Sequence, residues 1–392
     1  MGELVDRVVR KNTNNESTLP LTISAQYGLV DQITYFNNRV ASRDVSNYYL
    51  VLNGEFAYNK STSDGYPFGA VKRLDLYEKG VLSTLYIVFA PKKEQQIDSD
   101  YLTVFFDTDR WHKGVAERAA EGARNHGLLN ISAEDFFDID LSVPKDIVEQ
   151  KQIGAFIRQL DNLITLHQRK FEKLTNVKKS MLEKMFPQNG SSYPEIRFKG
   201  FTDPWEQRKA IDIADYSKGN GYSKGDLTDA GTPIILYGRL YTKYQFAISE
   251  VDTFAVPRNG AVYSQGNEVI VPASGETAED IARASAVEKS GVLLGGDLNI
   301  LRPFDFINPL FLALAISNGE PQKELAKKAQ GKSVVHIHNT DIQEVTIVYP
   351  SRTEQDRIVS VFRQLDHLIT LHQRELKKLQ NIKKSMLEKM FV

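Results

Sequence analysis

The apolar residues of this 392-residue chain follow two different patterns. In residues 149–186 and 354–391 they recur at alternating steps of three and four. Such spacing puts them on one stripe of an α-helix and is the heptad pattern of a coiled coil. At about 1.5 Å per residue, each segment predicts a helix roughly 55 Å long.

Each predicted helix buries a stripe made of apolar residues and one histidine. The members are Ile153, Ile157, Leu160, Ile164, His167, Phe171 and Leu174 in the first helix, and Ile358, Phe362, Leu365, Ile369, His372, Leu376 and Leu379 in the second. The two histidines occupy equivalent positions, where a polar residue can fix the register of a coiled coil. A packed ring bonded to a carbonyl oxygen is the simpler interpretation, and we favour it.

The two helical segments are copies of one another. They align without gaps at an offset of 205 residues and are identical at 26 of 38 positions. Elsewhere the two halves of the chain hardly align, and a repeat of this length is too long for a solenoid. The pattern indicates two different domains on a duplicated helical scaffold. If the chain leaves along one helix and returns along the other, the helices form an antiparallel coiled coil with a pseudo-two-fold axis.

The rest of the chain alternates short β-like runs with turn residues and a few helical stretches. Residues 48–52 and 101–106 are predicted strands, and residues 309–329 are a predicted helix. The predicted fold class is therefore α+β. In chain order the predicted segments are a first domain (1–145), a first helix (146–187), a second domain (188–350) and a second helix (351–392).

Composition narrows the function classes. Hydrophobic residues make up 41% of the chain and charged residues 25%, as in soluble globular proteins, and no run approaches the roughly 18 apolar residues of a membrane span. Cysteine is absent, which excludes disulfides, thiolate metal sites and cysteine nucleophiles. The net charge is −1, but both helical segments carry a surplus of Lys and Arg, so the remainder is acidic. We expect a cytoplasmic protein.

Basic, hydroxyl, amide and aromatic residues interleave in each predicted domain. Such residues suit DNA, because Arg and Lys bind phosphates and guanine edges and Asn binds adenine. An ordinary surface loop has a similar composition, which is the alternative. The candidate DNA-binding residues are Asn59, Lys60, Ser61, Ser63, Tyr66, Lys72, Arg73, Tyr237, Arg239, Tyr241, Lys243 and Tyr263.

No catalytic or metal-binding constellation stands out. Residues 308–311, Asn-Pro-Leu-Phe, are similar to the Asn-Pro-Pro-Phe motif of amino-methyltransferases, but no glycine-rich cofactor loop accompanies them. A helix start with proline in its first turn is the simpler interpretation. Residues 336–338, His-Ile-His, are typical of one face of a strand. We therefore expect no catalytic residue, metal or cofactor in this chain.

The repeated block resembles a known family. Leu-Ile-Thr-Leu-His-Gln-Arg, at 163–169 and 368–374, and Lys-Lys-Ser-Met-Leu-Glu-Lys-Met-Phe, at 178–186 and 383–391, look like the helices shared by the specificity subunits of type I restriction–modification systems. The Pro…Glu-Gln pattern before each helix, and Arg-Phe-Lys-Gly-Phe from residue 197, extend the likeness over essentially the whole chain.

The resemblance implies two target-recognition domains, each reading one half of a bipartite, asymmetric DNA site. It implies that the helices set the gap between the half-sites and bind two methylation subunits, which carry S-adenosylmethionine. Restriction subunits, which are nuclease–translocases, join the full complex in a bacterial or archaeal cytoplasm, and no membrane is involved. The chain itself would be non-catalytic.

One departure concerns the start of each half. Residues 1–4 correspond to residues 210–213, and residues 197–209 have no counterpart in the first half. Two other functions remain as alternatives. A coiled-coil adaptor would have no DNA readout, and a self-sufficient methyltransferase would need the cofactor loop that the sequence lacks.

Overall fold

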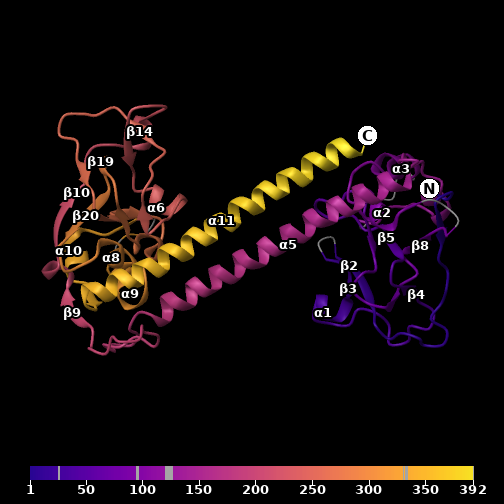
Figure 1. Ribbon diagram of the computed structural model, residues 1–392, viewed down its shortest axis with the longest axis horizontal. Coiled ribbons are helices and arrows are strands. Elements are labelled where there is room, and N and C mark those ends of the chain that lie inside the picture. The colour runs from indigo at the N-terminus through magenta and orange to yellow at the C-terminus, as the bar shows by residue number, and fades with distance from the viewer. Residues whose placement is uncertain (25–26, 94–96, 120–126, 330, 332–333, 392) are drawn as a thin grey trace. The chain divides into compact units, whose positions relative to one another are not determined.

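The computed structural model describes residues 1–24, 27–93, 97–119, 127–329, 331 and 334–391 (Figure 1). The chain forms two compact units, one made of Met1–Gln168 with Arg374–Val392 and the other of Arg169–Gln373. Each long helix therefore begins in one unit and ends in the other. The sequence analysis instead divided the chain into consecutive segments, with each helix a segment of its own.

The first unit combines small antiparallel sheets with short helices, and the first long helix leaves it. Its elements are β1 (Val5–Arg7), β2 (Leu21–Ser24), β3 (Gly28–Asp31), α1 (Gln32–Phe36), β4 (Tyr49–Leu52), β5 (Phe56–Asn59), β6 (Ala70–Arg73), β7 (Lys79–Leu82), β8 (Ile87–Pro91), α2 (Ser99–Phe105), α3 (His112–Arg118), α4 (Ala133–Phe137) and the long helix α5 (Ile147–Lys184).

The second unit has more strands and ends in the second long helix. Its elements are β9 (Glu206–Lys209), the 3-10 helix η1 (Ala210–Asp212), β10 (Ala214–Lys218), the 3-10 helix η2 (Lys224–Asp226), β11 (Leu227–Thr228), β12 (Thr232–Ile235), α6 (Arg239–Thr242), β13 (Ala247–Ile248), β14 (Phe254–Ala255), β15 (Tyr263–Gln265), β16 (Glu268–Pro272), β17 (Ser274–Gly275), α7 (Ala278–Ile281), β18 (Ser285–Val287), β19 (Ser290–Leu294), β20 (Leu298–Pro303), α8 (Pro309–Ile316), α9 (Gly319–Lys328), β21 (Val335–His336), α10 (Asn339–Gln343), β22 (Thr346–Tyr349) and the long helix α11 (Arg352–Met390).

The two units share one sheet topology although their sequences hardly align. The main sheet of the first unit has the order β1-β8-β5-β6, with all neighbours antiparallel. The order β10-β20-β16-β18 repeats this pattern in the second unit, where β13 is added parallel to β18. A smaller antiparallel pair also corresponds, since β4 pairs with β7 and β15 with β19. The duplication therefore includes the domains as well as the helices.

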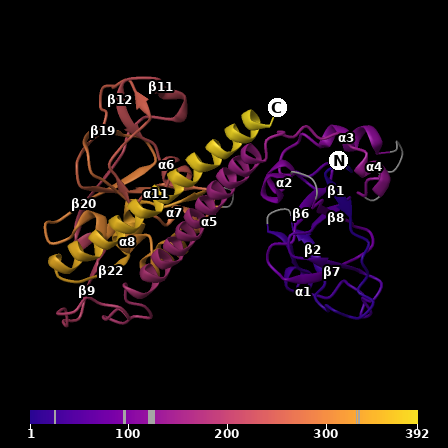
Figure 2. The same cartoon turned by 45° about the vertical axis from the view of Figure 1, so that its right-hand side comes forward.

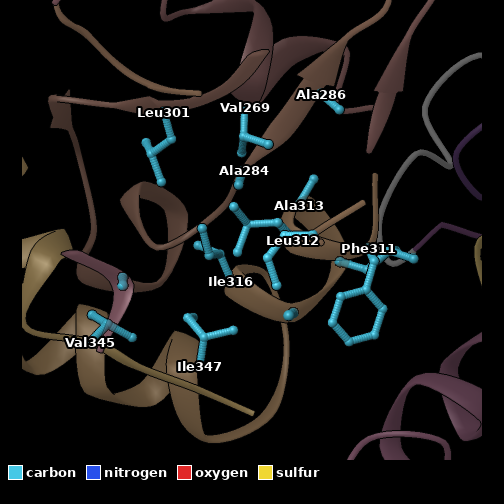
Figure 3. Packing of buried hydrophobic residues seen from close by; sticks show 14 of the residues in the cluster. Val269, Ala284, Ala286, Leu301, Phe311, Leu312, Ala313, Ile316, Val345 and Ile347 are labelled. Atoms are coloured by element: carbon cyan, nitrogen blue, oxygen red, sulfur yellow. The ribbon is translucent and has the colours of Figure 1, made fainter. Parts of the chain in front are cut away.

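The core of the second unit lies between its main sheet and α8. Every residue of α8 from Phe311 to Ile316 is buried, as expected for a helix that is apolar on all sides. Figure 3 shows these side chains packed with Val269 of β16, Leu301 of β20 and Ile347 of β22. The predicted helix at residues 309–329 is two helices, α8 and α9, which meet near Ser317.

Residues 101–106 belong to helix α2 and its C-terminal cap, so the predicted strand there is wrong. Asp98 caps this helix, because its carboxylate accepts a hydrogen bond from the Tyr101 N–H at 2.9 Å. Tyr101, Leu102, Val104 and Phe105 are all buried. Periodicity cannot distinguish a short, fully buried helix from a buried strand, and here the capping aspartate starts a helix.

The end of each long helix closes the core of one domain. Phe391, just beyond α11, is buried and stacks on the ring of Tyr101 in α2, with ring centroids 5.4 Å apart. Phe186, just beyond α5, is also buried and stacks on Phe311 of α8 at 5.6 Å. The two phenylalanines are equivalent in the repeat, so α2 and α8 hold equivalent places in the two units.

A buried glutamine joins the first turns of each long helix to the same short helix. Gln150 accepts a hydrogen bond from the backbone N–H of Asp98, the residue that caps α2, at 2.8 Å. Gln355 accepts one from the backbone N–H of Asn308, which caps α8, at 2.7 Å. Each glutamine also donates to the carbonyl of the proline that precedes its helix, at 2.7 and 2.9 Å. These contacts fix the angle at which each domain meets its helix.

The long helices run antiparallel in each unit. In the first unit, Ile153, Ile157 and Leu160 of α5 share an apolar cluster with the last turns of α11. In the second, the last turns of α5 pack with Ile358 and Phe362 of α11, and Figure 2 shows the first turns of α11 beside α8 and β22. The remaining members of the predicted seam, both histidines included, are half-buried.

The two domains also begin alike. The Leu4 N–H donates to the Met1 carbonyl at 2.9 Å, and the Ile213 N–H donates to the Ala210 carbonyl at 3.3 Å. This matches the predicted correspondence of residues 1–4 with 210–213. In the second unit β9 precedes this point and pairs with β22.

Candidate nucleic-acid interface

Arg73 and Lys72 on β6 are held in ion pairs within the first unit. The side chain of Arg73 is 7% exposed, and its guanidinium lies 2.7 Å from the Asp75 carboxylate and 2.8 Å from that of Asp100. Lys72 lies 2.6 Å from Asp107. Because a buried, doubly paired guanidinium cannot reach a phosphate or a base, Arg73 is withdrawn from the candidate DNA-binding residues. Lys72 is half-buried and stays a weaker candidate.

The loop at residues 59–66, at the end of β5, is held by several hydrogen bonds. The Tyr66 N–H donates to the Ser63 carbonyl at 2.9 Å across an Asp-Gly turn. The Asn59 side chain accepts from the Ser61 N–H at 3.0 Å, and Lys60 donates to a backbone carbonyl at 3.3 Å. Both serines are exposed. The predicted candidates here are therefore brought together on one fixed loop, and their contact with DNA stays a prediction.

Arg239 and Tyr241 of α6 support the second unit from within. The side chain of Arg239 is 9% exposed, and its guanidinium lies 2.6 Å from Asp252 and 2.9 Å from the Glu250 carbonyl. The Tyr241 hydroxyl donates to the Ser274 carbonyl. Both side chains are used in tertiary contacts, so they too are withdrawn as DNA contacts.

Three other candidates of the second unit are exposed. Tyr237, Lys243 and Tyr263 all reach the surface. Lys243 shares Asp252 with Arg239, at 2.6 Å. Hydrogen bonds from Lys243 and then Arg239 lower the pKa of Asp252 to about 2. This carboxylate stays charged at neutral pH and reduces the local positive charge, so the aromatic residues are the better candidates.

Two neighbouring loops, the glycine-rich residues 219–226 and residues 256–260, form a further exposed surface of the second unit. Asn220 donates to the Gly260 carbonyl at 2.9 Å, and the Arg258 N–H donates to the Tyr222 hydroxyl at 2.8 Å. The Arg258 guanidinium lies over the Tyr222 ring, 5.1 Å from its centroid, and Asn259 is exposed. The sequence-based candidates did not include these loops, although the Gly-Asn-Gly and Asn-Gly turns of the loops were readable in the sequence.

The first unit exposes an aromatic patch, which was also not among the sequence-based candidates. None of the five residues of α1 is buried. Tyr35 and Phe36 are 49% and 50% exposed, and their rings meet edge to face at 5.0 Å. Val40 nearby is exposed, and so is Arg39, which donates to the Ser42 carbonyl at 3.0 Å. Exposed apolar clusters of this kind mark interaction surfaces. We define the aromatic patch as these four residues.

A polar cleft of about 620 Å³ lies in the first unit between β6, the segment after α2 and the long helices. Lys72, Asp107, His112, Asp161 and Lys383 are among its lining residues. Its cations and carboxylates pair with each other, Lys72 with Asp107 and Lys383 with Asp161, and burial lowers the pKa of His112. Asp109 also lines the cleft, so its aspartates outnumber its lysines and it offers no surplus cation to a phosphate.

Residues 308–311 start a helix, as the simpler interpretation held. Asn308 caps α8 by accepting hydrogen bonds from the N–H groups of Leu310 and Phe311, at 2.8 and 3.3 Å. In the described part of the chain, no three or more His, Asp or Glu side chains gather as a metal site would need. Within the same residues, no helix combines the length and apolar character that crossing a membrane takes.

Comparison with known proteins agrees with this architecture. A family model described as the type I restriction modification DNA specificity domain matches residues 76–176 and 202–381. The specificity subunit of the type I restriction enzyme MjaVIII from Methanocaldococcus jannaschii is 21% identical over 368 residues, which cover 90% of this chain and 82% of that protein. The S subunit of a type I restriction–modification system from M. genitalium has a similar fold, with a TM-score of 0.60 at 12% identity over 100% of this chain and 94% of that one. The HsdS subunit from Thermoanaerobacter tengcongensis aligns over 100% and 95% of the two chains, with a TM-score of 0.45 at 16% identity.

The two matched regions place this chain in a class of DNA-specificity proteins built on duplicated domains and long helices. The chain belongs to the type I restriction–modification DNA specificity family. The resemblance found in the repeated helices is thereby confirmed, as are the α+β class with an antiparallel helix pair and the role in DNA recognition.

Proposed function

We propose that this chain reads a bipartite, asymmetric DNA site, one half with each unit. The observation that supports this proposal is that one topology carries two unlike surfaces. The first unit presents the aromatic patch after β3, and the second presents the loops at residues 219–226 and 256–260, with Arg258 and Asn259. A shared scaffold that carries two different surfaces suits the reading of two different DNA sequences.

The two surfaces suit different readout chemistry. Tyr35 and Phe36 offer apolar contact to thymine methyl groups, and Arg39 supplies a cation for the phosphate backbone. In the second unit, Asn259 can bind an adenine edge through two hydrogen bonds. Arg258 is exposed, but its guanidinium pairs with Asp226, so it is a weaker candidate for binding guanine. The loop at residues 59–66 adds hydroxyl groups that suit phosphates.

Replacing the aromatic patch tests this proposal. We expect Tyr35→Ser with Phe36→Ser to weaken recognition of one half-site about tenfold or more, because burying an exposed side chain the size of phenylalanine contributes about 1.5–3 kcal/mol. The other half-site and the melting temperature should stay unchanged, since neither ring is buried. Methylation-sensitive sequencing of DNA modified by the chain with its methylation subunits measures both half-sites.

A matched control removes an equally exposed apolar residue elsewhere in the unit. Leu85 is 66% exposed and lies outside the patch, so Leu85→Ser should leave both half-sites intact. If the double variant changes both half-sites or neither, the assignment of this patch is wrong. If no DNA sequence is preferred by the unaltered complex, a coiled-coil adaptor replaces the proposed function.

The long helices supply the spacing and the partner sites in this proposal. Outward-facing leucines recur at equivalent places, Leu163 and Leu166 on α5 and Leu368 and Leu371 on α11, with exposures between 39% and 46%. Exposed leucine pairs on a charged helix favour a protein partner. Two identical surfaces predict two methylation subunits, and these would carry S-adenosylmethionine and the chemistry that this chain would lack. The complex would act on cytoplasmic DNA, with restriction subunits added for cleavage.

Removing one leucine pair tests the partner sites. We expect Leu163→Ser with Leu166→Ser to reduce the complex from two methylation subunits to one, because the second pair, on α11, is untouched. Native mass spectrometry of the assembled complex counts the subunits. Two subunits retained by the variant would contradict this assignment, and the four-serine variant should bind none.

A further inference from the structure

We propose that two equivalent ion pairs, Asp161–Lys383 and Lys178–Asp366, fix the register of α5 against α11 and so help to set the gap between the half-sites. The effect on the gap rests on the proposed function. The effect on register rests on the contacts described below.

Each ion pair joins the two long helices within one unit. In the first unit, Lys383 Nζ of α11 lies 2.6 Å from Asp161 Oδ1 of α5. In the second, Lys178 Nζ of α5 lies 2.5 Å from Asp366 Oδ1 of α11. The side chains are between 21% and 43% exposed. Because they are partly shielded from water, salt screens these pairs less than pairs at the open surface.

Both pairs specify the same register. In an antiparallel pair of helices, the numbers of two opposed residues add to a constant. The two ion pairs give the same total, since Asp366 and Lys383 are the copies of Asp161 and Lys178 at the repeat offset. The duplicated sequence therefore places one ion pair in each unit, and both ion pairs favour the same register.

The seam between the long helices does not by itself exclude the neighbouring registers. A slip of one heptad moves every seam residue onto another seam position, so the apolar contacts between the helices are largely kept. Phe391 and Phe186, which are buried in the domain cores, also favour the native register, and the ion pairs add to this preference along the helices. The ion pairs are lost in such a slip. Asp161 would then oppose Leu376 or Met390, and Asp366 would oppose Phe171 or Met185. A carboxylate against apolar side chains loses water without gaining a partner, and the slipped registers are disfavoured.

The consequence for spacing follows from helix geometry. One heptad is about 10 Å along a helix, which equals about three base pairs of DNA. A complex with mixed registers would tolerate several gaps, whereas a single register selects one. The ion pairs are thus positioning residues, which act on the DNA site through the helices.

The absence of cysteine from the chain makes a direct test practical. Asn162→Cys on α5 and Asn381→Cys on α11 place two spin labels in the first unit of the full chain, at exposed positions. Pulsed electron resonance should give one narrow distance. Adding Asp161→Lys and Asp366→Lys sets lysine against lysine. We expect fewer than half of the molecules to keep the native distance, and the others to show shifted distances.

Two further variants keep the test decisive. The exchanged variant, with Asp161→Lys, Lys383→Asp, Lys178→Asp and Asp366→Lys, should recover the single native distance. Glu134→Lys, which breaks the exposed Arg7–Glu134 pair of the first unit, should leave that distance unchanged. A native distance that persists in the double reversal overturns the proposal. So does a slipped register that the exchanged variant fails to restore.

The gap is measured separately, in the complex with methylation subunits. A plasmid library with the two half-sites at different gaps is methylated and sequenced. The double reversal should accept several gaps, and a chain with seven residues inserted after both Gln168 and Gln373 should favour a gap about three base pairs wider. If the register shifts but the gap does not, the ion pairs fix the register but do not set the gap. If the insertion widens the gap but the double reversal keeps the native register, the helices set the gap and the ion pairs do not fix the register.

Discussion

Phe391→Ala is expected to destabilise the first unit by about 3–5 kcal/mol, the usual cost of removing a buried phenylalanine. The ring is 3% exposed and packs between Tyr101 and Phe105, at centroid distances of 5.4 and 6.1 Å. Its removal leaves a cavity beside α2, on which the core of that domain rests. The second unit should keep its stability, because it contains no part of this contact.

The two tryptophans allow each unit to be followed by itself. Trp111 is buried in the first unit and Trp205 in the second, so a fluorotryptophan label gives one resonance for each. In urea, the Trp111 resonance of Phe391→Ala should change at lower denaturant while that of Trp205 does not. Phe186→Ala, the equivalent variant, should do the reverse. Equal shifts of both resonances in either variant would show that the units unfold as one.

Arg197→Ala should destabilise the second unit by about 3–5 kcal/mol, as expected when one partner of a buried ion pair is removed. Arg197 Nε and Nη2 each donate to one oxygen of Glu354, both at 2.8 Å. Glu354 is 1% exposed, so the variant leaves a buried carboxylate without its cation. The denaturant dependence of the Trp205 resonance measures this loss.

The repeat supplies a matched control. Glu149 is the copy of Glu354 in the first unit, where it is exposed. Glu149→Ala should therefore change stability by no more than about 0.5 kcal/mol. Replacing both Arg197 and Glu354 by methionine should restore most of the loss, because no buried charge then remains. A double variant as unstable as Arg197→Ala would show that packing of the guanidinium is the larger effect.

The helices and their pairing were predictable from the sequence, because the seam repeats with a period that only a coiled coil explains. Both copies show the same spacing, and 26 identical positions establish the repeat. The shared topology of the domains was not predictable. Strand order depends on pairings between residues far apart, such as Val5 with Pro91 and Ala214 with Pro303, and no local pattern records them.

The candidate site was only partly predictable for a related reason. Arg73 and Arg239 are basic residues in polar stretches, yet Asp75, Asp100 and Asp252 hold them in tertiary ion pairs. Composition cannot tell an arginine that supports a fold from one that faces a ligand. The aromatic patch was not predicted for the opposite reason, because Tyr35 and Phe36 look like core residues until the structure shows that about half of each is exposed.

The contact of Phe391 with α2 also constrains the order of events during synthesis. The domain that emerges first from the ribosome needs a ring that is made almost 300 residues after Tyr101. The second domain has its equivalent ring, Phe186, already in place before α8 is translated. The unit that is translated first is therefore the last to complete its core.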